Sequence, residues 1–280
     1  MKHAFTVDLE DWFDGIPIDA ATKAAVERRL EVGADRLLHL LADRKVRATF
    51  FVLGGVAKAY PALLHRISDL GHEIGSHGLS HDLIYSMSPE RFRDETRRSM
   101  RDIEDCIGKP VRSYRAAYFS ITRQSFWALE ILAGDGIRFD SSIFPVNNWR
   151  YGINDYSRTP LVIRTANGPI LEFPVSTRRF MRWNVPTTGG AYFRIYPYWI
   201  TRSNIKRNEE EGLPVVFYLH PWELDPQHPV VRFHYKAMAT HYVNLRSTTA
   251  RLQRLLSDFE FTTLSEVLSA RFPEVSAQLF

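Results

Sequence analysis

Short β-rich runs alternate with helical patterns along most of the chain, and this alternation restricts the fold more than any other feature. The runs AFTVDL (4–9) and RATFFV (47–52) are the first two strand candidates. The stretch between them carries apolar residues at helical spacing: Val26, Leu30, Leu37, Leu38 and Leu41. Such alternation is typical of βα repetition around a parallel sheet. Because 45% of the 280 residues are hydrophobic, the chain can bury one large core. We therefore expect an α/β protein, most simply a one-domain barrel.

The later segments continue the same pattern. A helix is predicted at 60–70, and another is predicted where Ser88 can cap the N-terminus, Pro89 fits the first turn and Gly108 can end the helix. Further candidates are the strands HEIG (72–75), VRSYR (111–115), IRFDSS (137–142) and LPVVFYLH (213–220) and a helix near 125–133. Residues 145–200 are richer in aromatics, Pro and Gly, and we interpret them as an insertion. No linker or repeat divides the chain, so residues 1–280 are expected to form a single domain.

Charge and cysteine content exclude several classes of function. The formal net charge of +4 is spread along the chain and forms no basic stripe, so no nucleic-acid partner is expected. Cys106 is the only cysteine, which excludes an internal disulfide and a metal site built from cysteine pairs. No signal-like segment is visible, and no apolar run approaches the roughly 20 residues of a membrane span. A cytoplasmic protein without a transmembrane segment is the expectation.

Polar residues collect where the predicted strands end. In a parallel βα fold these carboxyl ends form the active-site face, so their side chains are candidates for chemistry. The residues at these positions are Asp8, Glu10, Asp11, His77, His81, Arg115, Asp140 and His220. Each has a simpler structural interpretation: acids after a strand are often solvated or cap a helix, His220 can be a buried core histidine, and Arg115 can pair with Asp8 or Asp140. Their joint position at strand ends favours a functional site.

The segment SHGLSH (76–81) places His77 and His81 four residues apart. On a helical turn this spacing puts both imidazoles on one face. Two histidines and a carboxylate make a three-ligand divalent metal site with open positions for water and substrate. A shared cation also explains the crowded acids at 8–11, because it removes the repulsion between like charges.

Seven ordered motifs resemble those of the polysaccharide deacetylase family, also described as NodB homology or carbohydrate esterase family four. They are TVDLED (6–11), SHGLSH (76–81), RAAYFSIT (115–122), FDSSIFP (139–145), EFPVST (172–177), GGAYFRIYP (189–197) and FYLHPWELDP (217–226). The resemblance is strongest to an exopolysaccharide-locus branch, whose first motif is similar to T-V-D-V-E-D. A carboxyl-terminal extension of that branch resembles HYVNLRSTTARLQRLLSDFEF (241–261), within residues 225–280. The resemblance implies a distorted (β/α) barrel with about seven parallel strands.

The resemblance also implies a metal held by one carboxylate, His77 and His81, with Zn²⁺ expected and Co²⁺ or Ni²⁺ as alternatives. The family motif has adjacent aspartates where this chain reads D-L-E-D, so Glu10 or Asp11 can supply the carboxylate. Side chains alternate along an extended strand, so Asp8 and Glu10 point the same way whereas Asp11 need not. We therefore choose Glu10 and keep Asp11 as the alternative.

By the same resemblance, the chain hydrolyses an N-acyl group, most simply N-acetyl, on an amino sugar of a surface polysaccharide or its precursor. Asp8 is then the general base, Arg115 orients it, and His220 is the general acid. The glycan or an activated sugar is the expected partner. Two alternatives stay open: an amidohydrolase acting on a small cyclic amide or imide, and a catalytically silent carbohydrate-binding relative.

Substrate contacts are expected from Tyr118, Asp140, Trp222 and Tyr192, with a backbone N–H near Tyr118 stabilising the oxyanion. Flat aromatic rings suit apolar sugar faces, so at least one ring of the insertion is expected at the pocket mouth. The candidates are Trp149, Tyr151, Tyr156, Trp183, Tyr192 and Tyr196. The sequence departs from the family pattern at two places expected to contact substrate. Ala117 replaces a proline. Asn147, Asn148 and Trp149 stand where this branch often has His-Asp.

Overall fold

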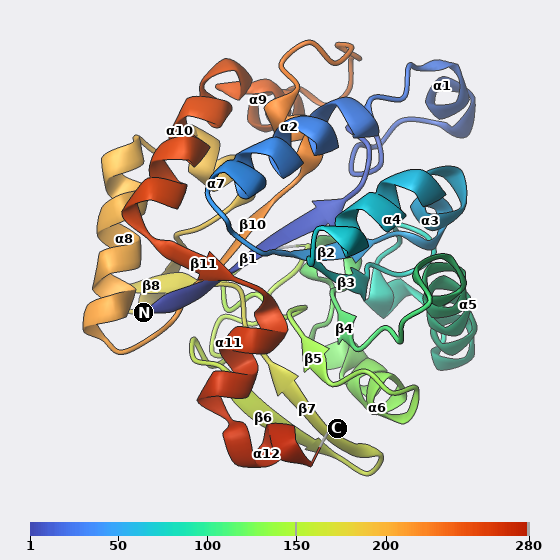
Figure 1. Ribbon diagram of the computed structural model, residues 1–280, viewed down its shortest axis with the longest axis vertical. Helices are drawn as coiled ribbons and strands as arrows, with labels where there is room; N and C mark the ends of the chain where they lie inside the picture. The colour runs from blue at the N-terminus through green and yellow to red at the C-terminus, as the bar shows by residue number, and fades with distance from the viewer. Residues whose placement is uncertain (149, 279–280) are drawn as a thin grey trace.

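The computed structural model describes residues 1–148 and 150–278 and consists of a central sheet surrounded by helices (Figure 1). Along the sheet the strand order is β10-β1-β2-β3-β4-β5-β7-β6. Neighbours from β10 to β7 are all parallel, and β6 joins β7 antiparallel. The α/β class and the mostly parallel sheet predicted from the alternation are therefore confirmed.

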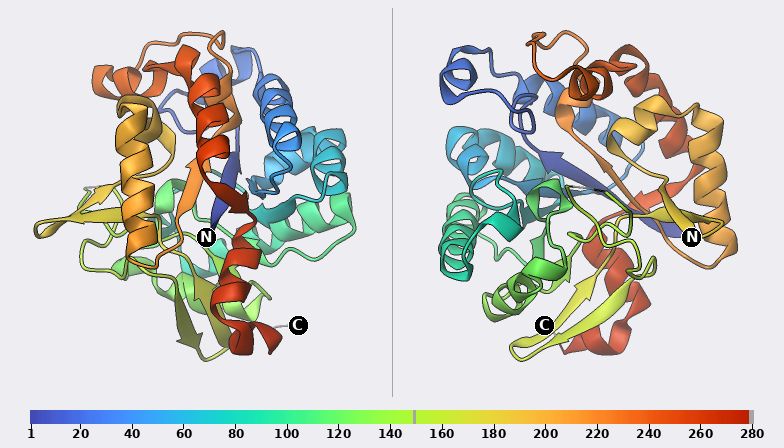
Figure 2. Two further views of the ribbon diagram at one scale, coloured as in Figure 1. Left: turned by 60° about the vertical axis from the view of Figure 1, so that its left-hand side comes forward. Right: turned by 180° about the vertical axis from the view of Figure 1, so that it is seen from behind.

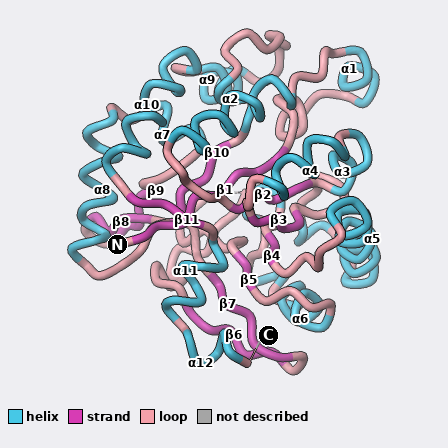
Figure 3. The backbone as a smooth tube through the Cα atoms, viewed as in Figure 1, coloured by secondary structure: helices cyan, strands magenta, loops and turns pink. Residues whose placement is uncertain are grey.

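The strands are short, and several are buried on both faces. Their bounds are β1 (Lys2–Leu9), β2 (Thr49–Val52), β3 (Glu73–Ser76), β4 (Ser113–Tyr114), β5 (Phe139–Asp140), β6 (Leu161–Thr165), β7 (Gly168–Glu172), β8 (Thr177–Phe180), β9 (Trp183–Pro186), β10 (Val216–Leu219) and β11 (Glu260–Thr262). Figure 3 shows β1, β2, β3 and β10 near the centre of the molecule with helices around them. Parallel strands covered on both sides have near-continuous apolar sequences, as TFFV in β2 illustrates.

Most of the helices cover the outside of the sheet. Their bounds are α1 (Ala20–Ala25), α2 (Leu30–Asp43), α3 (Gly54–Ala59), α4 (Pro61–Asp69), α5 (Pro89–Ile107), α6 (Trp127–Gly134), α7 (Gly190–Ile195), α8 (Tyr198–Glu210), α9 (Tyr235–Tyr242), α10 (Leu245–Asp258), α11 (Leu264–Arg271) and α12 (Pro273–Ala277). Helix α5 begins and ends as predicted: the Ser88 side chain accepts the N–H of Arg91, and Gly108 adopts a left-handed conformation with φ 66°. The amphipathic helix after β1 starts at Leu30, because Val26 lies at the end of α1 in extended backbone.

The inner face of the sheet changes from apolar to polar along the strands, and the site lies at its polar end. On β1, Phe5, Val7 and Leu9 belong to the large core between the sheet and the helices. Ala4 belongs to a smaller apolar cluster on the inner face, where α11 also packs. Asp8, further along the same inner face, is buried among polar groups. The inner face is thus apolar at the amino ends of the strands and polar at their carboxyl ends.

The segment interpreted as an insertion belongs partly to the main sheet. β7 pairs in parallel with β5, so part of the segment 145–200 belongs to the main sheet. Beyond β7, Ser176 Oγ accepts the N–H of Val216 in β10 at 2.8 Å, and Thr188 Oγ1 donates to the Val216 carbonyl at 2.8 Å. These side-chain hydrogen bonds connect the β7 end of the sheet to β10. The antiparallel β8–β9 hairpin projects from this region (Figure 2).

The carboxyl-terminal segment completes the core instead of lying outside it. β11 pairs in parallel with β1, and α10 contacts α7 and α8. Leu264 and Leu268 of α11 are fully buried in the inner apolar cluster. Within the described residues, no helix has the length and apolar character needed to cross a membrane.

Candidate active site

Side chains from three strand ends meet in a pocket at the carboxyl side of the sheet. Asp8 lies near the end of β1, Glu10 follows this strand, His77 follows β3, and His220 follows β10. The pocket has a volume of about 200 Å³. Its lining includes Asp8, Glu10, Trp12, His77, His81, Tyr118, Tyr151, Tyr218, His220, Trp222 and His241. Most residues predicted to carry chemistry are therefore brought together.

Glu10, His77 and His81 form a group that could hold a metal ion, because their ligand atoms all lie within 4.8 Å of one another. Nδ1 of His77 lies 2.7 Å from the Arg115 carbonyl oxygen. A carbonyl only accepts, so Nδ1 carries the proton and donates it, which leaves the Nε2 lone pair directed at Glu10, 3.9 Å away. Burial lowers the pKa of His77 and favours the neutral imidazole that a metal requires.

The carboxylate of Glu10 also fits this role. Its Oε2 is buried without a hydrogen-bond partner among the described residues, although His81 Nε2 lies 2.8 Å away. Burial opposes the charge of Glu10, but the imidazoles, His81 first, outweigh it and lower the pKa of Glu10 to about 2. A buried, ionised carboxylate oxygen facing two imidazole nitrogens is a donor set that suits a divalent cation such as Zn²⁺.

The two histidines reach this arrangement by a different local structure from the predicted one. Residues 77–81 form a loop after β3, not a helical turn. Gly78 adopts φ +85°, a conformation that L side chains rarely take, and its N–H donates to Ser76 Oγ. The helical interpretation of the four-residue spacing was wrong, because this glycine turns the chain and the turn brings the imidazole centroids to 5.4 Å.

Asp11 points away from this group. Its carboxylate accepts the N–H of Trp12 at 2.9 Å and the N–H of Arg29 at 3.1 Å, just before α2. Burial raises the pKa of Asp11 to about 6. Asp11 thus has the structural role often found for an acid after a strand, because its carboxylate binds backbone N–H groups. Glu10 instead faces the histidines.

Asp8 is held by a fully buried arginine. Arg115 Nη1 donates to Asp8 Oδ1 at 2.9 Å and to Thr6 Oγ1 at 2.8 Å. The remaining donors bind the carbonyl and hydroxyl of Ser141, and the guanidinium lies 4.4 Å from the Phe51 ring centroid. Arg115 does not line the pocket; it fixes Asp8 from beneath, and this pairing keeps one Asp8 oxygen available to the pocket.

His220 also lies close to Glu10, and its ring is held in place through Nδ1. Nε2 is 3.5 Å from Glu10 Oε1 and 3.9 Å from Asp8 Oδ2, and Nδ1 is 2.8 Å from Glu223 Oε1. Burial alone would lower the pKa of His220, but Glu223, Glu10 and Asp8 outweigh it and raise the pKa to about 9. His220 is therefore protonated at neutral pH and can donate from Nε2.

Sequence reasoning missed Glu223 and Arg194. Arg194 Nε donates to Glu223 Oε2 at 2.5 Å, and its Nη1 binds the carbonyls of His241 and Val243. Burial would raise the pKa of Glu223, but Arg194 and His220 lower it to about 2, so a full negative charge faces His220. The position of Glu223, three residues after His220 in HPWE, was the available signal. Arg194 had none.

Two of the four predicted substrate residues line the pocket. Trp222 stacks on His220 with ring centroids 5.3 Å apart, and the Tyr118 ring meets the edge of His81 at 4.2 Å. Tyr118 has φ 56°, within the short helical turn Ala117–Phe119 (η2) that contains the proline-to-alanine departure. Tyr192 does not line the pocket but packs against the apolar cluster behind it, where burial raises the pKa of its hydroxyl.

Asp140 was predicted to contact substrate, and the structure contradicts this. It is fully buried and accepts the hydroxyl of Ser142 at 2.6 Å, while Ser142 Oγ accepts the N–H of Ala116 at 2.8 Å. Its neighbour Glu172 is also fully buried, and burial followed by the charge of Asp140 raises the pKa of Glu172 well above its usual value. Asp140 thus supports the loop beside the pocket from within the core.

We expect the Glu172–Asp140 pair to give a distinctive pH dependence of stability. Because the folded pKa of Glu172 is raised above 4.5, its contribution is complete below that pH and is lost as the pH rises toward the folded value. Glu172→Gln keeps an acceptor for the Ile143 N–H and a donor toward Asp140. The free energy of unfolding of Glu172→Gln should therefore increase relative to that of the wild type as the pH rises above about 5, through the raised pKa of Glu172. Denaturant titrations of both proteins across this pH range test this, with the exposed Glu274→Gln as control. Parallel pH dependences would refute the raised pKa of Glu172.

One aromatic ring of the insertion reaches the pocket. Tyr151 lines it, which confirms that at least one of the six rings does so. Trp183 is instead 45% exposed on the β8–β9 hairpin. Trp149 lies outside the described residues. Of the two asparagines before it, Asn148 accepts the backbone N–H of Arg150 and lines a polar cavity beside the pocket.

Two family models match the chain. Residues 19–134 match the model described as polysaccharide deacetylase, and residues 141–269 match a domain of unknown function, DUF3473. The first segment contains His77, His81 and Arg115, and the second contains His220. Asp8 and Glu10 precede both segments.

Similar proteins point the same way. A peptidoglycan deacetylase from Helicobacter pylori is 31% identical over 137 residues, which cover 49% of this chain and 42% of that protein. A chitooligosaccharide deacetylase from Rhizobium leguminosarum is 28% identical over 123 residues, covering 44% of this chain and 53% of that protein. The matches thus span about half the length of these relatives. A crystal structure assigned to the polysaccharide deacetylases, from Mycobacterium smegmatis, superposes with a TM-score of 0.70 at 20% identity and covers 98% of this chain and 90% of that one, which supports the fold.

Proposed function

We propose that this chain, which contains a polysaccharide deacetylase domain, is a metal-dependent hydrolase that removes an N-acyl group, most simply N-acetyl, from an amino sugar of a surface polysaccharide or its precursor. Relatives named as peptidoglycan and chitooligosaccharide deacetylases support the carbohydrate N-deacetylase class. The resemblance of the first and last motifs to an exopolysaccharide-locus branch motivates the choice of a surface polysaccharide.

One observation carries the proposal: three functions needed for amide hydrolysis are present in a single pocket. Glu10, His77 and His81 can hold a cation, Asp8 offers a fixed carboxylate, and His220 offers a proton. His220 Nε2 lies 3.9 Å from Asp8 Oδ2 and 3.5 Å from Glu10 Oε1, so the base, the acid and a metal ligand share one small space. Amide hydrolysis requires a base for water and an acid for the leaving amine, and this arrangement supplies both.

Each residue then has a defined task. A divalent metal bound by Glu10, His77 and His81 would polarise the amide carbonyl and make a water molecule more acidic. Asp8, oriented by Arg115, accepts a proton from the attacking water. His220 donates its Nε2 proton to the departing amine, which would otherwise be a poor leaving group. Trp222, stacked on His220, and Tyr118, beside His81, shape the space between them.

The test is amine release by the purified chain loaded in turn with Zn²⁺, Co²⁺ or Ni²⁺. N-acetyl and N-formyl amino sugars and their oligosaccharides test the proposal, and cyclic amides and imides test the amidohydrolase alternative. Turnover of N-acyl sugars that stops after chelation and returns with metal is the expected result. Stoichiometric metal with no turnover of any amide would favour a silent relative and overturn the proposal.

Glu223→Gln should lower kcat by roughly 10- to 100-fold, the scale seen when the partner of a functional histidine is removed. The glutamine can still accept the Nδ1 proton of His220 but cannot stabilise the imidazolium charge. The pKa of His220, followed by NMR of the imidazole protons, should fall in this variant. An unchanged imidazole pKa would show that Glu223 only supports the fold.

A further inference from the structure

A second and larger cavity adjoins the metal pocket. Its volume is about 780 Å³, and it shares four lining residues with the metal pocket. The shared residues are Gly15, His220, Trp222 and His241. Because His220 forms part of both walls, a molecule whose amide lies beside Asp8 and His220 can extend directly into this second cavity.

Part of the wall of the larger cavity is unsuited to a sugar. Its lining away from the metal pocket includes the apolar residues Ile16, Pro17, Leu83, Ala191, Phe233 and Ala237, together with the polar residues Tyr85, Arg150, Arg194, His234 and Thr240. Sugar hydroxyls buried against such a wall would lose hydrogen bonds to water without replacement. An apolar chain would instead gain by leaving water.

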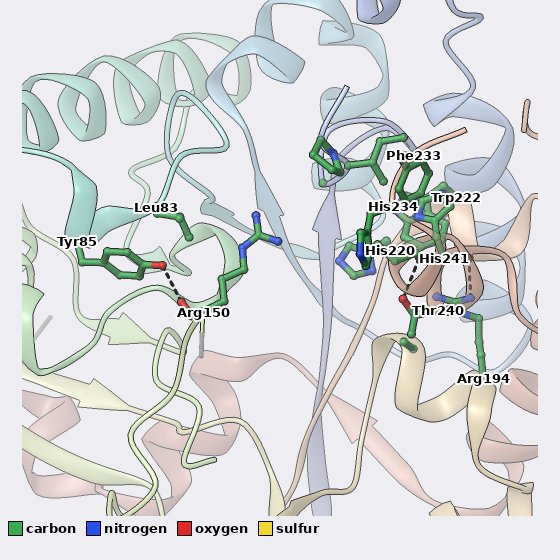
Figure 4. A pocket seen from close by; sticks show the side chains of 15 residues that line it. Leu83, Tyr85, Arg150, Arg194, His220, Trp222, Phe233, His234, Thr240 and His241 are labelled. Carbon is green, nitrogen blue, oxygen red and sulfur yellow. Dashed lines mark hydrogen bonds between the residues drawn. The ribbon is translucent and has the colours of Figure 1, made fainter. Parts of the chain in front are cut away.

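Arg150 supplies a cation at the edge of this apolar space. Its guanidinium lies 3.7 Å from the Tyr118 ring centroid, and Tyr118 lines the metal pocket. Figure 4 shows the Arg150 side chain extending from the side of Tyr85 toward the opposite wall formed by His220, Trp222 and Phe233. Among the described residues, no carboxylate lies within ion-pairing distance of the Arg150 guanidinium. The guanidinium contacts the ring and the hydroxyl of Tyr118, but no carboxylate of the described residues neutralises its charge, so it can bind an anion, and phosphate matches its geometry.

A third cavity, of about 420 Å³, lies on the other side of Arg150 and has the opposite character. Arg150 and Tyr85 line both this cavity and the apolar one, and Tyr151 lines both this cavity and the metal pocket. The polar side chains of this third cavity are Thr122, Arg123, Gln124, Asn148, Asn154 and Asp155. The metal pocket is thus flanked by a polar space suited to a further sugar and an apolar space, with Arg150 between them.

We propose that the substrate is a lipid-linked saccharide, in which the amino sugar is joined through a phosphate to an apolar chain. The sugar occupies the metal pocket, the phosphate binds Arg150, and the chain lies along the wall formed by Leu83, Phe233 and Ala237. This rests on the proposed deacetylase function and names the chemical class of its substrate. The positive charge of Arg150 complements a phosphate, and the wall beside it is apolar. These two features favour a lipid-linked saccharide over a neutral glycan.

Four compounds separate the contributions of phosphate and chain: N-acetylglucosamine, its 1-phosphate, its decyl glycoside and its 1-(decyl phosphate) diester. The diester should be turned over with kcat/KM at least tenfold above that of the decyl glycoside, and further above that of the free sugar. N-decanoylglucosamine tests whether the apolar chain belongs on the amide instead. Preference for that compound, or equal rates for the diester and the glycoside, would overturn the proposal while leaving deacetylation intact.

Arg150→Met should lower kcat/KM for the diester by a larger factor than for the decyl glycoside, because only the diester carries the phosphate, and the preference for the diester should be lost. Arg123→Met is the matched control, because Arg123 is already paired with Asp155 at 2.7 Å. Ala237→Asp should weaken the dependence on chain length by adding a charge to the apolar wall, and Ala239→Asp, exposed on the same helix, should not.

A binding measurement keeps this test separate from catalysis. Titration calorimetry of monomeric decyl phosphate into the metal-free protein should show saturable binding that Arg150→Met weakens about tenfold or more. Decyl glucoside should bind more weakly to the wild type and equally to both proteins. If no amide substrate is turned over, the proposed function fails, but this titration still decides the Arg150 site. Equal binding of decyl phosphate by the wild type and Arg150→Met would overturn it.

Discussion

His77→Ala should abolish stoichiometric Zn²⁺ binding and lower amine release by at least about 10³-fold, since the metal's contribution to amide polarisation is worth several kcal/mol. His81→Ala should behave in the same way. The fold should persist in both, because the sheet and helices bury large apolar clusters that do not include these side chains. Metal content of the dialysed protein and the thermal unfolding midpoint measure the two effects separately.

Two controls make this result specific. His65→Ala removes an exposed histidine on α4 and should leave metal content unchanged. Glu10→Gln should lose the metal, whereas Asp11→Asn should keep it, because the Asp11 carboxylate binds the N–H groups of Trp12 and Arg29. Full metal retention in His77→Ala, or loss of metal only in Asp11→Asn, would show that the cation is bound elsewhere.

Several residues of the candidate site could be selected from sequence because they lie at or just after the ends of predicted strands. Once AFTVDL was taken as a strand, alternation placed Asp8 and Glu10 on one face and left Asp11 on the other, as the structure has them. The carboxyl ends of parallel strands meet at one edge, so His77 and His220 could be brought to the same place without knowledge of their distances.

Local backbone and buried partners could not be predicted in this way. The spacing of His77 and His81 suited a helical turn, but a left-handed Gly78 produces the same proximity in a loop. Asp140 also lies at a strand end, but its side chain points into the core, where it forms hydrogen bonds with Ser142 and Glu172.

The partner of the general acid shows a second limit. Glu223 lies three residues after His220, so the sequence places it near this histidine. Arg194 lies on α7, 29 residues before Glu223. Only the packing of α7 beside the segment after β10 makes the Arg194–Glu223 pair. Periodicity in the sequence does not indicate such a contact. The negative charge of Glu223, which raises the pKa of His220, therefore depends on tertiary packing that the sequence pattern does not show.

Asp8→Asn and His220→Ala should each lower kcat for an N-acetyl amino sugar by roughly 10²–10⁴-fold, the usual scale for general acid–base groups. Metal binding should survive in both, since neither side chain belongs to the ligand group. The amide introduced by Asp8→Asn keeps an oxygen that accepts from Arg115, so the buried guanidinium retains a partner. Loss of metal in either variant would mean that the measured decrease does not report proton transfer.

The choice of leaving group can separate the two roles. An amine must be protonated to depart, whereas the 4-nitrophenolate of an aryl acetate leaves as a stable anion and needs no acid. His220→Ala should therefore hydrolyse 4-nitrophenyl acetate at a rate close to that of the wild type, while its amide hydrolysis is impaired. Asp8→Asn should lose both activities, because water must be deprotonated in either reaction. If both variants lose ester hydrolysis equally, His220 acts in the attack step, and the assignment of base and acid to Asp8 and His220 is wrong.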